Sequence, residues 1–317
     1  MNKIAYLRLM HSFIVQEEIF VIYPEKCSLL GNRLVRELKA KSIRYESKKF
    51  PDGEKYVRII DEVKDKDIVV LYSMFKSVDE DILEFVFLVK TLRDLGASRI
   101  VGVIPYFPYA RQDRRFLPGE AVTRRIVAEL FDSLNLNALI TVDVHRPHDE
   151  SMLLERILKT KVFEVSAMGE LAKYIVREYT VEKPIVIGPD RGGEFWAKKA
   201  ASAIGAEYDY LVKKRISAYE VKLEPKRVDV EGRSIIIVDD IISTGGTMAK
   251  AVKYLLELGA KEVYAASTHG LLIGNAVEKI FNAGAKDLVC SDTIPSQYSK
   301  VSVAGLIADV VRRILQS

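Results

Sequence analysis

The chain has 317 residues, 49% of them hydrophobic, and its 48 basic and 44 acidic side chains leave a net charge of +4 at pH 7. This length and apolar content predict a folded protein with room for two domains of ordinary size, and they exclude a largely disordered chain. The positive excess is too small to indicate nucleic acid, and no apolar run reaches the roughly 18 residues that span a membrane, so we expect neither as a partner.

Strands and amphipathic helices alternate along most of the chain. After residues 1–17, which fit neither pattern, we expect a strand at 19–23, a helix at about 28–39, a strand at 68–71, a helix at about 79–95 and a strand at 100–104. This alternation is typical of parallel βαβ units. A last amphipathic helix, at about 303–315, is expected to pack back on the first domain.

One helix ending occurs twice, 163 residues apart. The two copies align without gaps, as Leu92, Leu95, Gly96, Ala97 and Ile100 against Leu255, Leu258, Gly259, Ala260 and Val263. Glycine is a common helix stop, so coincidence is the alternative, but we interpret the repeat as the trace of a duplication. The predicted fold class is therefore α/β, with two similar Rossmann-like domains that contain parallel sheets, at residues 1–160 and 161–317.

The loop after the strand at 100–104 reads Pro-Tyr-Phe-Pro-Tyr-Ala-Arg-Gln-Asp-Arg-Arg. Its aromatic rings could stack a base, its arginines could bind phosphates, and its prolines make it stiff. The alternative is a solvated basic loop, which the interleaved aromatic residues make the weaker choice.

Two further strands end in titratable side chains. The strand that begins at Ala138 runs into Asp143 and His145, a pair suited to metal or phosphate, whereas His148 lies among polar loop residues and is a weaker candidate. In the second half, a buried strand from Pro184 is followed by Asp190 and a double glycine before a helix, which predicts a backbone nest for phosphate.

The segment 211–219 leaves a strand and carries three consecutive basic residues. Basic side chains on a mobile loop could close over a phosphate chain, and a charged surface loop is the alternative.

The most informative stretch is 235–247, which reads Ile-Ile-Ile-Val-Asp-Asp-Ile-Ile-Ser-Thr-Gly-Gly-Thr and leads into a helical pattern. It predicts a buried strand, a tight loop and a helix start. Carboxylates at the end of a parallel strand can bind sugar hydroxyls, and small residues before a helix N-terminus can bind phosphate. A phosphorylated sugar fits this combination.

This stretch resembles the phosphoribosyl-binding signature of type I phosphoribosyltransferases and phosphoribosyl diphosphate synthetases. The loop with Phe-Pro-Tyr-Ala-Arg-Gln-Asp and the motifs at 143–145, 190–193 and 213–215 follow in family order, so from about residue 18 the chain resembles a ribose-phosphate diphosphokinase. The resemblance implies transfer of the β,γ-diphosphoryl group of ATP to the anomeric hydroxyl of ribose 5-phosphate, giving 5-phosphoribosyl 1-diphosphate and AMP for nucleotide biosynthesis, with Mg²⁺ as cofactor.

The resemblance also implies the role of each site residue. ATP would be bound by Arg111, Gln112 and Asp113, and by Phe50, Asp52 and Glu54 of a neighbouring subunit, which makes the protein a homo-oligomer and at least a dimer. The metal on the ATP phosphates would lie at His145 and Asp190. Ribose 5-phosphate would be bound by Asp239, Asp240, Ser243, Thr244, Gly245, Gly246 and Thr247. The catalytic residues would be Lys213 and Arg215. Ser243 stands where many members carry Asp, which we interpret as a subgroup difference.

Two alternatives remain at this point. A phosphoribosyltransferase would need only the second-domain motifs, and a catalytically silent regulatory subunit would bind ATP without turnover. The cysteines, Cys27 and Cys290, lie far apart and fit no metal-ligand spacing, which is typical of buried thiols in a reducing cytoplasm, where we expect the protein to work.

Overall fold

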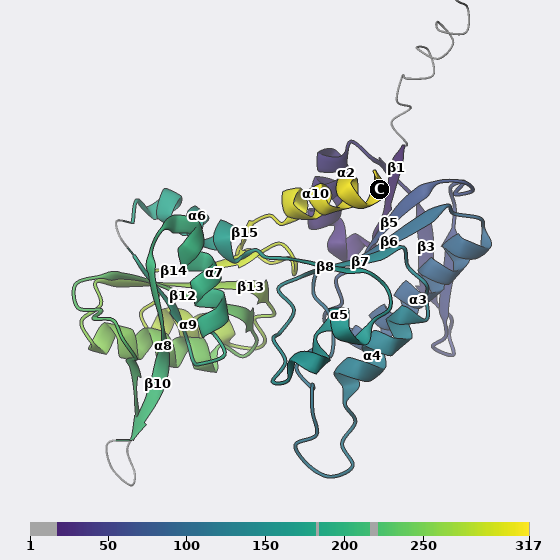
Figure 1. Ribbon diagram of the computed structural model, residues 1–317. Helices are drawn as coiled ribbons and strands as arrows, with labels where there is room; N and C mark the ends of the chain where they lie inside the picture. The colour runs from purple at the N-terminus through teal and green to yellow at the C-terminus, as the bar shows by residue number, and fades with distance from the viewer. Residues whose placement is uncertain (1–17, 182–183, 216–220, 317) are drawn as a thin grey trace, which may run out of the picture.

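The computed structural model describes residues 18–181, 184–215 and 221–316, and it forms two α/β halves (Figure 1). The expectations for residues 1–17 and for the tip of the 211–219 segment lie outside the described residues.

The first sheet has the strand order β2-β1-β5-β6-β7-β8, with every neighbouring pair parallel. Its strands are β1 (Ile19–Ile22), β2 (Lys41–Ser42), β5 (Asp67–Leu71), β6 (Arg99–Ile104), β7 (Ala138–Val142) and β8 (Val162–Val165). Its helices are α2 (Ser28–Leu38), α3 (Val78–Asp94), α4 (Thr123–Asp132) and the short α5 (Leu154–Ile157), with 3₁₀ turns η1 (Glu25–Cys27) and η2 (Glu150–Met152).

Helices cover both faces of this sheet because its central strands are apolar on both sides. All five residues of β5 are buried, as expected for a parallel strand between two helical layers. Ile68 and Val70 join the apolar cluster of α3 and α4, whereas Val69 and Leu71 join the cluster that contains α2. This alternation follows from the two-residue period of a strand.

The second sheet has the order β11-β10-β9-β12-β13-β14-β15, parallel except for the β10–β11 pair. Its strands are β9 (Ile185–Gly188), β10 (Glu207–Arg215), β11 (Val221–Pro225), β12 (Ser234–Ile242), β13 (Glu262–Gly270), β14 (Asp287–Ser291) and β15 (Ser299–Val301). Its helices are α7 (Glu194–Ile204), α8 (Gly246–Glu257) and α9 (Ala276–Asn282).

The two sheets are wound in the same way. Without β11, the order β10-β9-β12-β13-β14-β15 repeats the order β2-β1-β5-β6-β7-β8 strand for strand. Each half also has an antiparallel hairpin before its third strand. In the first half it consists of two extra strands, β3 (Tyr45–Lys49) and β4 (Lys55–Ile59), whereas in the second half the second strand, β10, itself pairs with one extra strand, β11. The predicted class of two similar α/β units with parallel sheets is confirmed, and the shared winding supports a duplication.

The halves exchange one helix each. The helix α6 (Met168–Tyr179) follows the first sheet but packs on α7 and on strands of the second sheet. In return, α10 (Ala304–Leu315) follows the second sheet but packs on α2, β7 and β8, beside which it lies in Figure 1. Each unit is thus completed by a helix that follows the other unit's last strand.

This exchange moves the domain boundary. A division between residues 160 and 161 would separate β8 from β7, with which it pairs along Leu139–Val142. We therefore propose a division after Val165, with α10 assigned to the first unit.

In the part of the chain that the structure describes, no helix has both the length and the apolar character needed to cross a membrane.

Candidate active site

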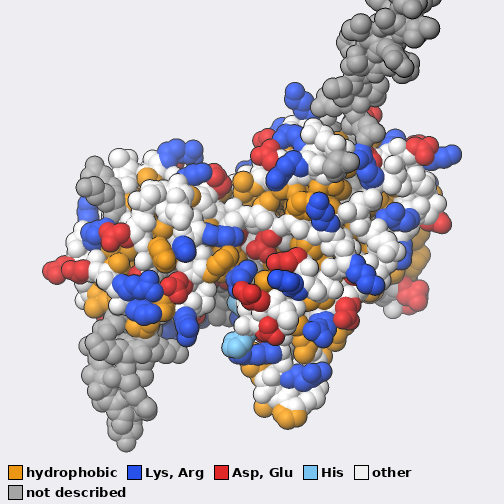
Figure 2. All heavy atoms as spheres, viewed as in Figure 1, with side chains coloured by type: hydrophobic (Ala, Val, Ile, Leu, Met, Phe, Trp, Pro, Cys, Tyr) orange, Lys and Arg blue, Asp and Glu red, His pale blue; other side chains and the backbone are white. Residues whose placement is uncertain are grey.

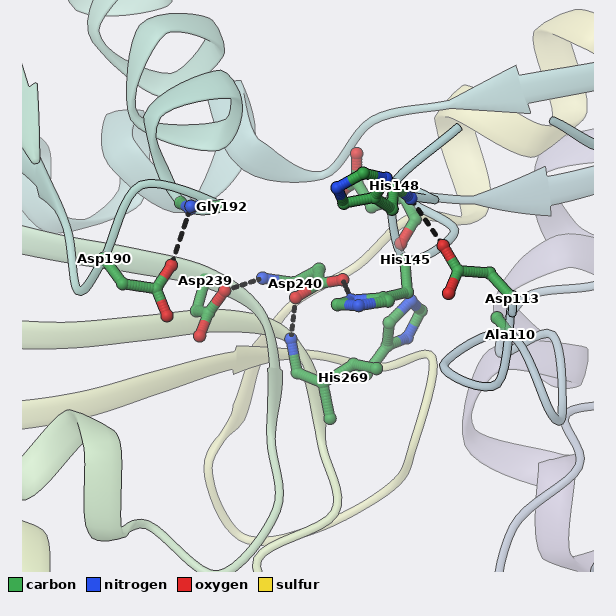
Figure 3. Close-up of polar contacts among 12 residues, drawn as sticks. Ala110, Asp113, His145, His148, Asp190, Gly192, Asp239, Asp240 and His269 are labelled. Carbon is green, nitrogen blue, oxygen red and sulfur yellow. Dashed lines mark hydrogen bonds and ion pairs between the residues drawn. The ribbon is translucent and has the colours of Figure 1, made fainter. Parts of the chain in front are cut away.

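A cavity of about 310 Å³ lies where the two halves meet. Most of its wall comes from the second half, and three residues of the first half complete it. It is lined by Arg111, His145, Arg146, Asp190, Gly192, Trp196 and residues 239–248. Figure 3 shows Asp190, Asp239 and Asp240 in a row that ends at His145.

Unequal strand lengths expose this wall. The pairing of β12 with β9 covers only 235–237, whereas its pairing with β13 continues to Ile242. The sequence predicted Asp239 and Asp240 at the end of a strand, and they lie near the end of β12, which continues to Ile242, at the point where β9 has already ended. Both carboxylates are therefore held on an ordered strand beside open space, and this gives them fixed positions.

The loop after β12 joins α8 in a conformation that requires glycine. Gly245 precedes the helix with a φ of 73°, and a Cβ atom there would lie 2.7 Å from the carbonyl oxygen of Ala276. The carbonyl of Ser243 accepts a hydrogen bond from Ile273 N–H at 2.9 Å, which fixes the loop further. The first N–H groups of α8 have no partner within the helix, and the helix dipole favours an anion there. Ser243, Thr244, Gly246 and Thr247 line the same cavity.

The pKa values of the two adjacent carboxyl groups are shifted in opposite directions. Asp240 Oδ2 lies 2.6 Å from Nδ1 of His145, and Asp239 Oδ1 accepts a hydrogen bond from Asp240 N–H at 3.0 Å. Burial, followed by the charge of Asp240, raises the pKa of Asp239 well above its usual value. Burial acts in the same direction on Asp240, but the hydrogen bond and charge of His145 outweigh it and lower the pKa of Asp240. Of the two carboxyl groups, Asp240 is therefore the one that loses its proton more readily.

Asp190 forms the opposite side of the cavity. Its Oδ1 accepts hydrogen bonds from Gly192 N–H at 2.8 Å and from Gly193 N–H at 3.2 Å. Gly193 has no room for a side chain, because a Cβ atom would lie 2.8 Å from Cα of Gly188. The loop is thus folded tightly against the end of β9, and the exposed Asp190 carboxylate is presented to the cavity.

The Arg-Gln-Asp segment reaches the cavity through its first residue alone. Arg111 lines it, but Gln112 Nε2 donates to the carbonyl of Arg114 at 3.1 Å, and Asp113 accepts a hydrogen bond from His148 N–H. Gln112 and Asp113 thus shape their own loop instead of facing the cavity in this structure.

The remaining predicted residues lie on the two inserted hairpins. Phe50, Asp52 and Glu54 are at the tip of the β3–β4 hairpin, do not line the cavity, and include an aromatic ring that is 44% exposed. Lys213 and Arg215 belong to β10 and pair through their backbones with Leu223 and Val221.

Asp143 has a structural position that the sequence did not indicate. It is fully buried, and its Oδ2 accepts hydrogen bonds from Thr268 Oγ1 at 2.6 Å and from Ala167 N–H at 2.8 Å. It therefore joins the two halves and does not line the cavity. Conversely, Arg146 and Trp196 do line it and were missed. Arg146 follows His145 directly, which was a usable signal, whereas Trp196 lies in an ordinary helical pattern.

The oxygen donors around the cavity suit a hard cation. Among residues 18–181, 184–215 and 221–316, no group of three or more His, Cys, Asp or Glu side chains could hold a metal ion. Mg²⁺ is commonly held by one or two protein ligands together with substrate phosphates. The carboxylate of Asp190 fits that mode, since it is exposed to the cavity opposite His145.

The sequence matches known families over most of its length. Residues 19–134 match the N-terminal domain of ribose phosphate pyrophosphokinase, and residues 156–293 match the phosphoribosyl transferase domain. The ribose-phosphate pyrophosphokinase of Methanopyrus kandleri is 42% identical over 285 residues, which cover 90% of this chain and 96% of that protein. Ribose-phosphate pyrophosphokinase 2 of Archaeoglobus fulgidus is 43% identical over 263 residues, or 83% of this chain and 89% of that protein.

The fold matches a solved structure across both halves. Phosphoribosylpyrophosphate synthetase from Mycobacterium smegmatis is 28% identical, with a TM-score of 0.83 over 94% of this chain and 99% of that one. A match of this extent includes both sheets and their relative placement, not a single α/β unit.

Proposed function

The chain belongs to the ribose-phosphate pyrophosphokinase family, and from this premise we propose how its cavity transfers diphosphate from ATP to ribose 5-phosphate. One observation carries the proposal: an anion site at a helix N-terminus and a pair of strand-held carboxylates share one wall, opposite cationic side chains of the other half.

Ribose 5-phosphate occupies the wall formed by the second half. Residues 243–247 bind its 5-phosphate, because the α8 N-terminus and Gly245 present backbone N–H groups to the cavity. Asp239 and Asp240 bind the ribose hydroxyls. Carboxylate oxygens accept hydrogen bonds, and two adjacent carboxyl groups on one strand suit neighbouring hydroxyl groups.

ATP occupies the side formed by the first half. Arg111 binds its phosphates from the cavity wall, and Gln112 and Asp113 hold the adjoining loop near the nucleotide. His145 and Asp190 hold Mg²⁺ together with the phosphate oxygens. When bound, Mg²⁺ supplies neutralisation of the phosphate charge.

The reaction is a displacement at phosphorus. The anomeric oxygen of ribose 5-phosphate forms a bond to the β-phosphorus of ATP, the bond from that phosphorus to the α-phosphate oxygen breaks, and AMP leaves while the hydroxyl loses its proton. Such transfers depend on alignment and charge stabilisation more than on a protein nucleophile. Arg111 supplies positive charge from the wall, and Lys213 and Arg215 supply it from the β10–β11 hairpin.

Two subunits complete each ATP site. Phe50, Asp52 and Glu54 lie at the tip of the β3–β4 hairpin and do not line the cavity of their own chain, so we assign them to the adenosine of a neighbouring subunit. Exposed apolar side chains support an interface on this half. They are Ile60 beside the hairpin, Leu83 and Phe87 on α3, and Ile126 and Leu130 on α4. The protein is therefore proposed to be at least a homodimer, and its buried free thiols agree with a cytoplasmic location.

The product nucleotide tests the reaction. The protein is mixed with ribose 5-phosphate, ATP and Mg²⁺, and the nucleotides are separated. AMP formed in step with a diphosphorylated sugar supports attack at the β-phosphorus. ADP would instead indicate γ-phosphoryl transfer, and bound ATP without turnover would indicate a regulatory subunit.

Subunit mixing tests the shared site. Asp52→Ala and Lys213→Ala proteins, each of low activity alone, are unfolded together, refolded and assayed. Part of the activity returns if the two changes lie in different subunits of one site, because some mixed sites contain neither change. Activity that stays at the level of the separate proteins would contradict a shared site.

A further inference from the structure

Arg124, on α4, is a buried cation that lies behind the cavity wall. Its side chain is among the largest fully buried ones, at 1% exposure. Arginine is rarely buried without a carboxylate partner, and among the described residues no carboxylate forms an ion pair with Arg124. Burial lowers its pKa to about 10, which still leaves the guanidinium charged at neutral pH. The carboxylates of Asp113, Glu164 and Glu155 act on it through charge alone, and the hydrogen bonds of the guanidinium go to other groups.

Three backbone carbonyls surround this guanidinium. Nε donates to the carbonyl of Met152 at 2.7 Å, and Nη1 donates to the carbonyls of Ala110 at 2.9 Å and His145 at 2.6 Å. These carbonyls belong to three separate segments: the loop between β6 and α4, the loop after β7, and η2. The single side chain therefore ties together parts of the chain that lie far apart in the sequence.

Two of these segments carry residues of the cavity wall. Ala110 precedes Arg111, and the backbone N–H of Arg124 also donates to the carbonyl of Gln112 at 3.2 Å, so Arg111 is held from both sides. The third carbonyl is that of His145 itself, whose ring lies 2.6 Å from Asp240. A shift in either loop would change what faces the cavity from the first half.

We propose that Arg124 is a positioning residue that sets Arg111 and His145 at the ATP side of the cavity. The proposal rests on the proposed function, because that assigns ATP phosphates and their metal to Arg111 and His145. None of these hydrogen bonds of Arg124 goes to the 243–247 loop, and Arg124 reaches the ribose side through the His145 ring and Asp240, so we expect its larger effect on ATP.

The role requires arginine and not simply a positive charge. The planar guanidinium presents donors in fixed directions to three acceptors at once, whereas the lysine ammonium is one nitrogen on a flexible stem. The next residue, Arg125, provides a matched control. It is on the same helix and carries the same charge, but its side chain is exposed and its contact is a 3.6 Å approach to Met152 Sδ.

The experiment compares Arg124→Lys and Arg124→Met with Arg125→Lys and Arg125→Met. For each protein, kcat and KM for ATP are measured, and the Kd for ribose 5-phosphate is measured by calorimetry without nucleotide. We expect kcat/KM for ATP to fall about 100-fold in Arg124→Met, because a misplacement of the reacting groups by about 1 Å costs about that factor. In Arg124→Lys, which keeps the positive charge, we expect a fall of about 10-fold. The Kd for ribose 5-phosphate should stay within about twofold, and both Arg125 variants should match the wild type.

A general loss of structure would give a different result. If ATP kinetics and ribose 5-phosphate binding weaken together, Arg124 is structural and the proposal is overturned. If Arg124→Met does not fold, the same split is sought in Arg124→Lys, and guanidinium ion is added to Arg124→Gly to test for recovery of turnover. Unchanged ATP kinetics in a folded Arg124→Met protein would also overturn the proposal.

Failure of the proposed function would be seen separately. If the wild type forms no AMP, the assigned reaction is wrong whatever Arg124 does. The Kd for a non-hydrolysable ATP analogue then replaces the kinetics, and equal values in the wild type and Arg124→Met would reject the positioning role.

Discussion

The two halves share one winding but use matching strand ends differently. Register identifies the match: Asp67 pairs with Arg99 in the first half as Ser234 pairs with Glu262 in the second, so Tyr72 and Ser73 correspond to Asp239 and Asp240. In the first half this strand end is filled, with Tyr72, Met74 and Phe75 all buried. In the second half it forms the cavity wall. The comparison shows that a few side chains, and not the repeated fold itself, make one strand end a binding site.

The contacts that hold the two exchanged helices differ less between the halves than the ligand-facing strand ends do. Asp143 follows β7 and accepts a hydrogen bond from Ala167 N–H at 2.8 Å, just before α6. Asp292 follows β14 and accepts one from Val303 N–H at 2.9 Å, just before α10. An equivalent carboxylate thus holds the start of each exchanged helix, whereas the ligand-facing strand ends have diverged.

The largest expected effect comes from the corresponding pair Asp240 and Ser73. We expect Asp240→Asn to lower kcat/KM for ribose 5-phosphate about 1000-fold, because it removes the charged acceptor and leaves His145 without its partner. Ser73 Oγ donates to the carbonyl of Thr293 at 2.5 Å, so Ser73→Ala should cost about 1 kcal/mol of stability and leave turnover unchanged. Steady-state kinetics and denaturant unfolding on both variants test these expected differences. An active Asp240→Asn protein would show that the two halves do not differ in the proposed way.

The next largest effect is expected from changes at the two hairpins. We expect Lys213→Ala to lower kcat about 100-fold, because it removes positive charge next to the transferred phosphates, while the melting temperature changes little. In the first half, buried Glu84 of α3 accepts hydrogen bonds from Tyr45 Oη at 2.8 Å and Lys55 Nζ at 2.6 Å of the β3–β4 hairpin. Glu84→Gln should therefore lower the melting temperature more than it lowers turnover. Kinetics and thermal melts on both proteins test the contrast, and a Lys213→Ala protein that is inactive because it is unfolded would contradict it.

Acid should weaken the contact between the halves through His269. Tyr106 and His269 are 163 residues apart, so they occupy equivalent positions of the repeat. The centres of their rings lie 5.0 Å apart where the halves meet. Burial lowers the pKa of His269 to about 4, so at pH 5 the unfolded chain takes up a proton that the folded protein does not. Stability contributed by this residue is thus present above about pH 6.5 and falls towards pH 4, by about 2 kcal/mol between pH 7 and pH 5.

Denaturant unfolding at the two pH values measures this loss. His269→Asn should lose about 2 kcal/mol less than the wild type between pH 7 and pH 5, whereas the exposed His148→Asn should behave as the wild type does. An equal loss in all three proteins would assign the acid sensitivity to other groups.

A smaller effect is expected from the backbone conformation of the loop at Gly245. Gly245→Ala places a methyl group 2.7 Å from a carbonyl oxygen at a φ of 73°, so the loop must shift. We expect the Kd for ribose 5-phosphate to rise about tenfold. Gly305→Ala, at a glycine of α10 with nothing within 4 Å of its added Cβ, is the control. Calorimetric titration gives both values, and unchanged binding by Gly245→Ala would mean that the loop tolerates the shift.

The smallest effect is expected at Lys76, which lies in the equivalent loop of the first half. Lys76 is exposed and has a φ of 69°, a conformation that costs an ordinary residue about 1 kcal/mol or more. Lys76→Gly removes that strain but adds chain entropy to the unfolded state, so we expect a gain of about 0.5 kcal/mol without a change in turnover. The midpoint of denaturant unfolding should rise slightly. A fall would mean that the lysine side chain stabilises the loop.

The sequence predicted those parts of the site that are continuous in the chain. Asp239 to Thr247 could be identified because strand, carboxylates and phosphate loop follow one another. Arg124 could not, since it stands beside Arg125 in an amphipathic helix, and the carbonyls that it binds are brought to it by the fold.

The same limit applied to the architecture. The sequence predicted the helix at about 303–315 and its packing on the first domain, as α10 does on α2. It did not predict α6, and an apolar stripe alone does not identify the surface that a helix covers. The domain boundary at 160 and 161 stays a prediction. We propose a later one because β8 pairs with β7 while the helix after it packs on the other unit, which nothing local in the sequence indicates.

The exchanged helix α10 has a consequence for biosynthesis. Leu30 and Leu34 of α2 share an apolar cluster with Ile307 and Val311 of α10, a helix that is synthesised after the whole second sheet. The amino-terminal unit therefore cannot close its core until α10 has left the ribosome, even though all its strands have emerged long before. Domains usually fold in order of synthesis, but here the first unit waits for a helix that follows the second, and its uncovered α2 face is the surface that a chaperone would have to protect.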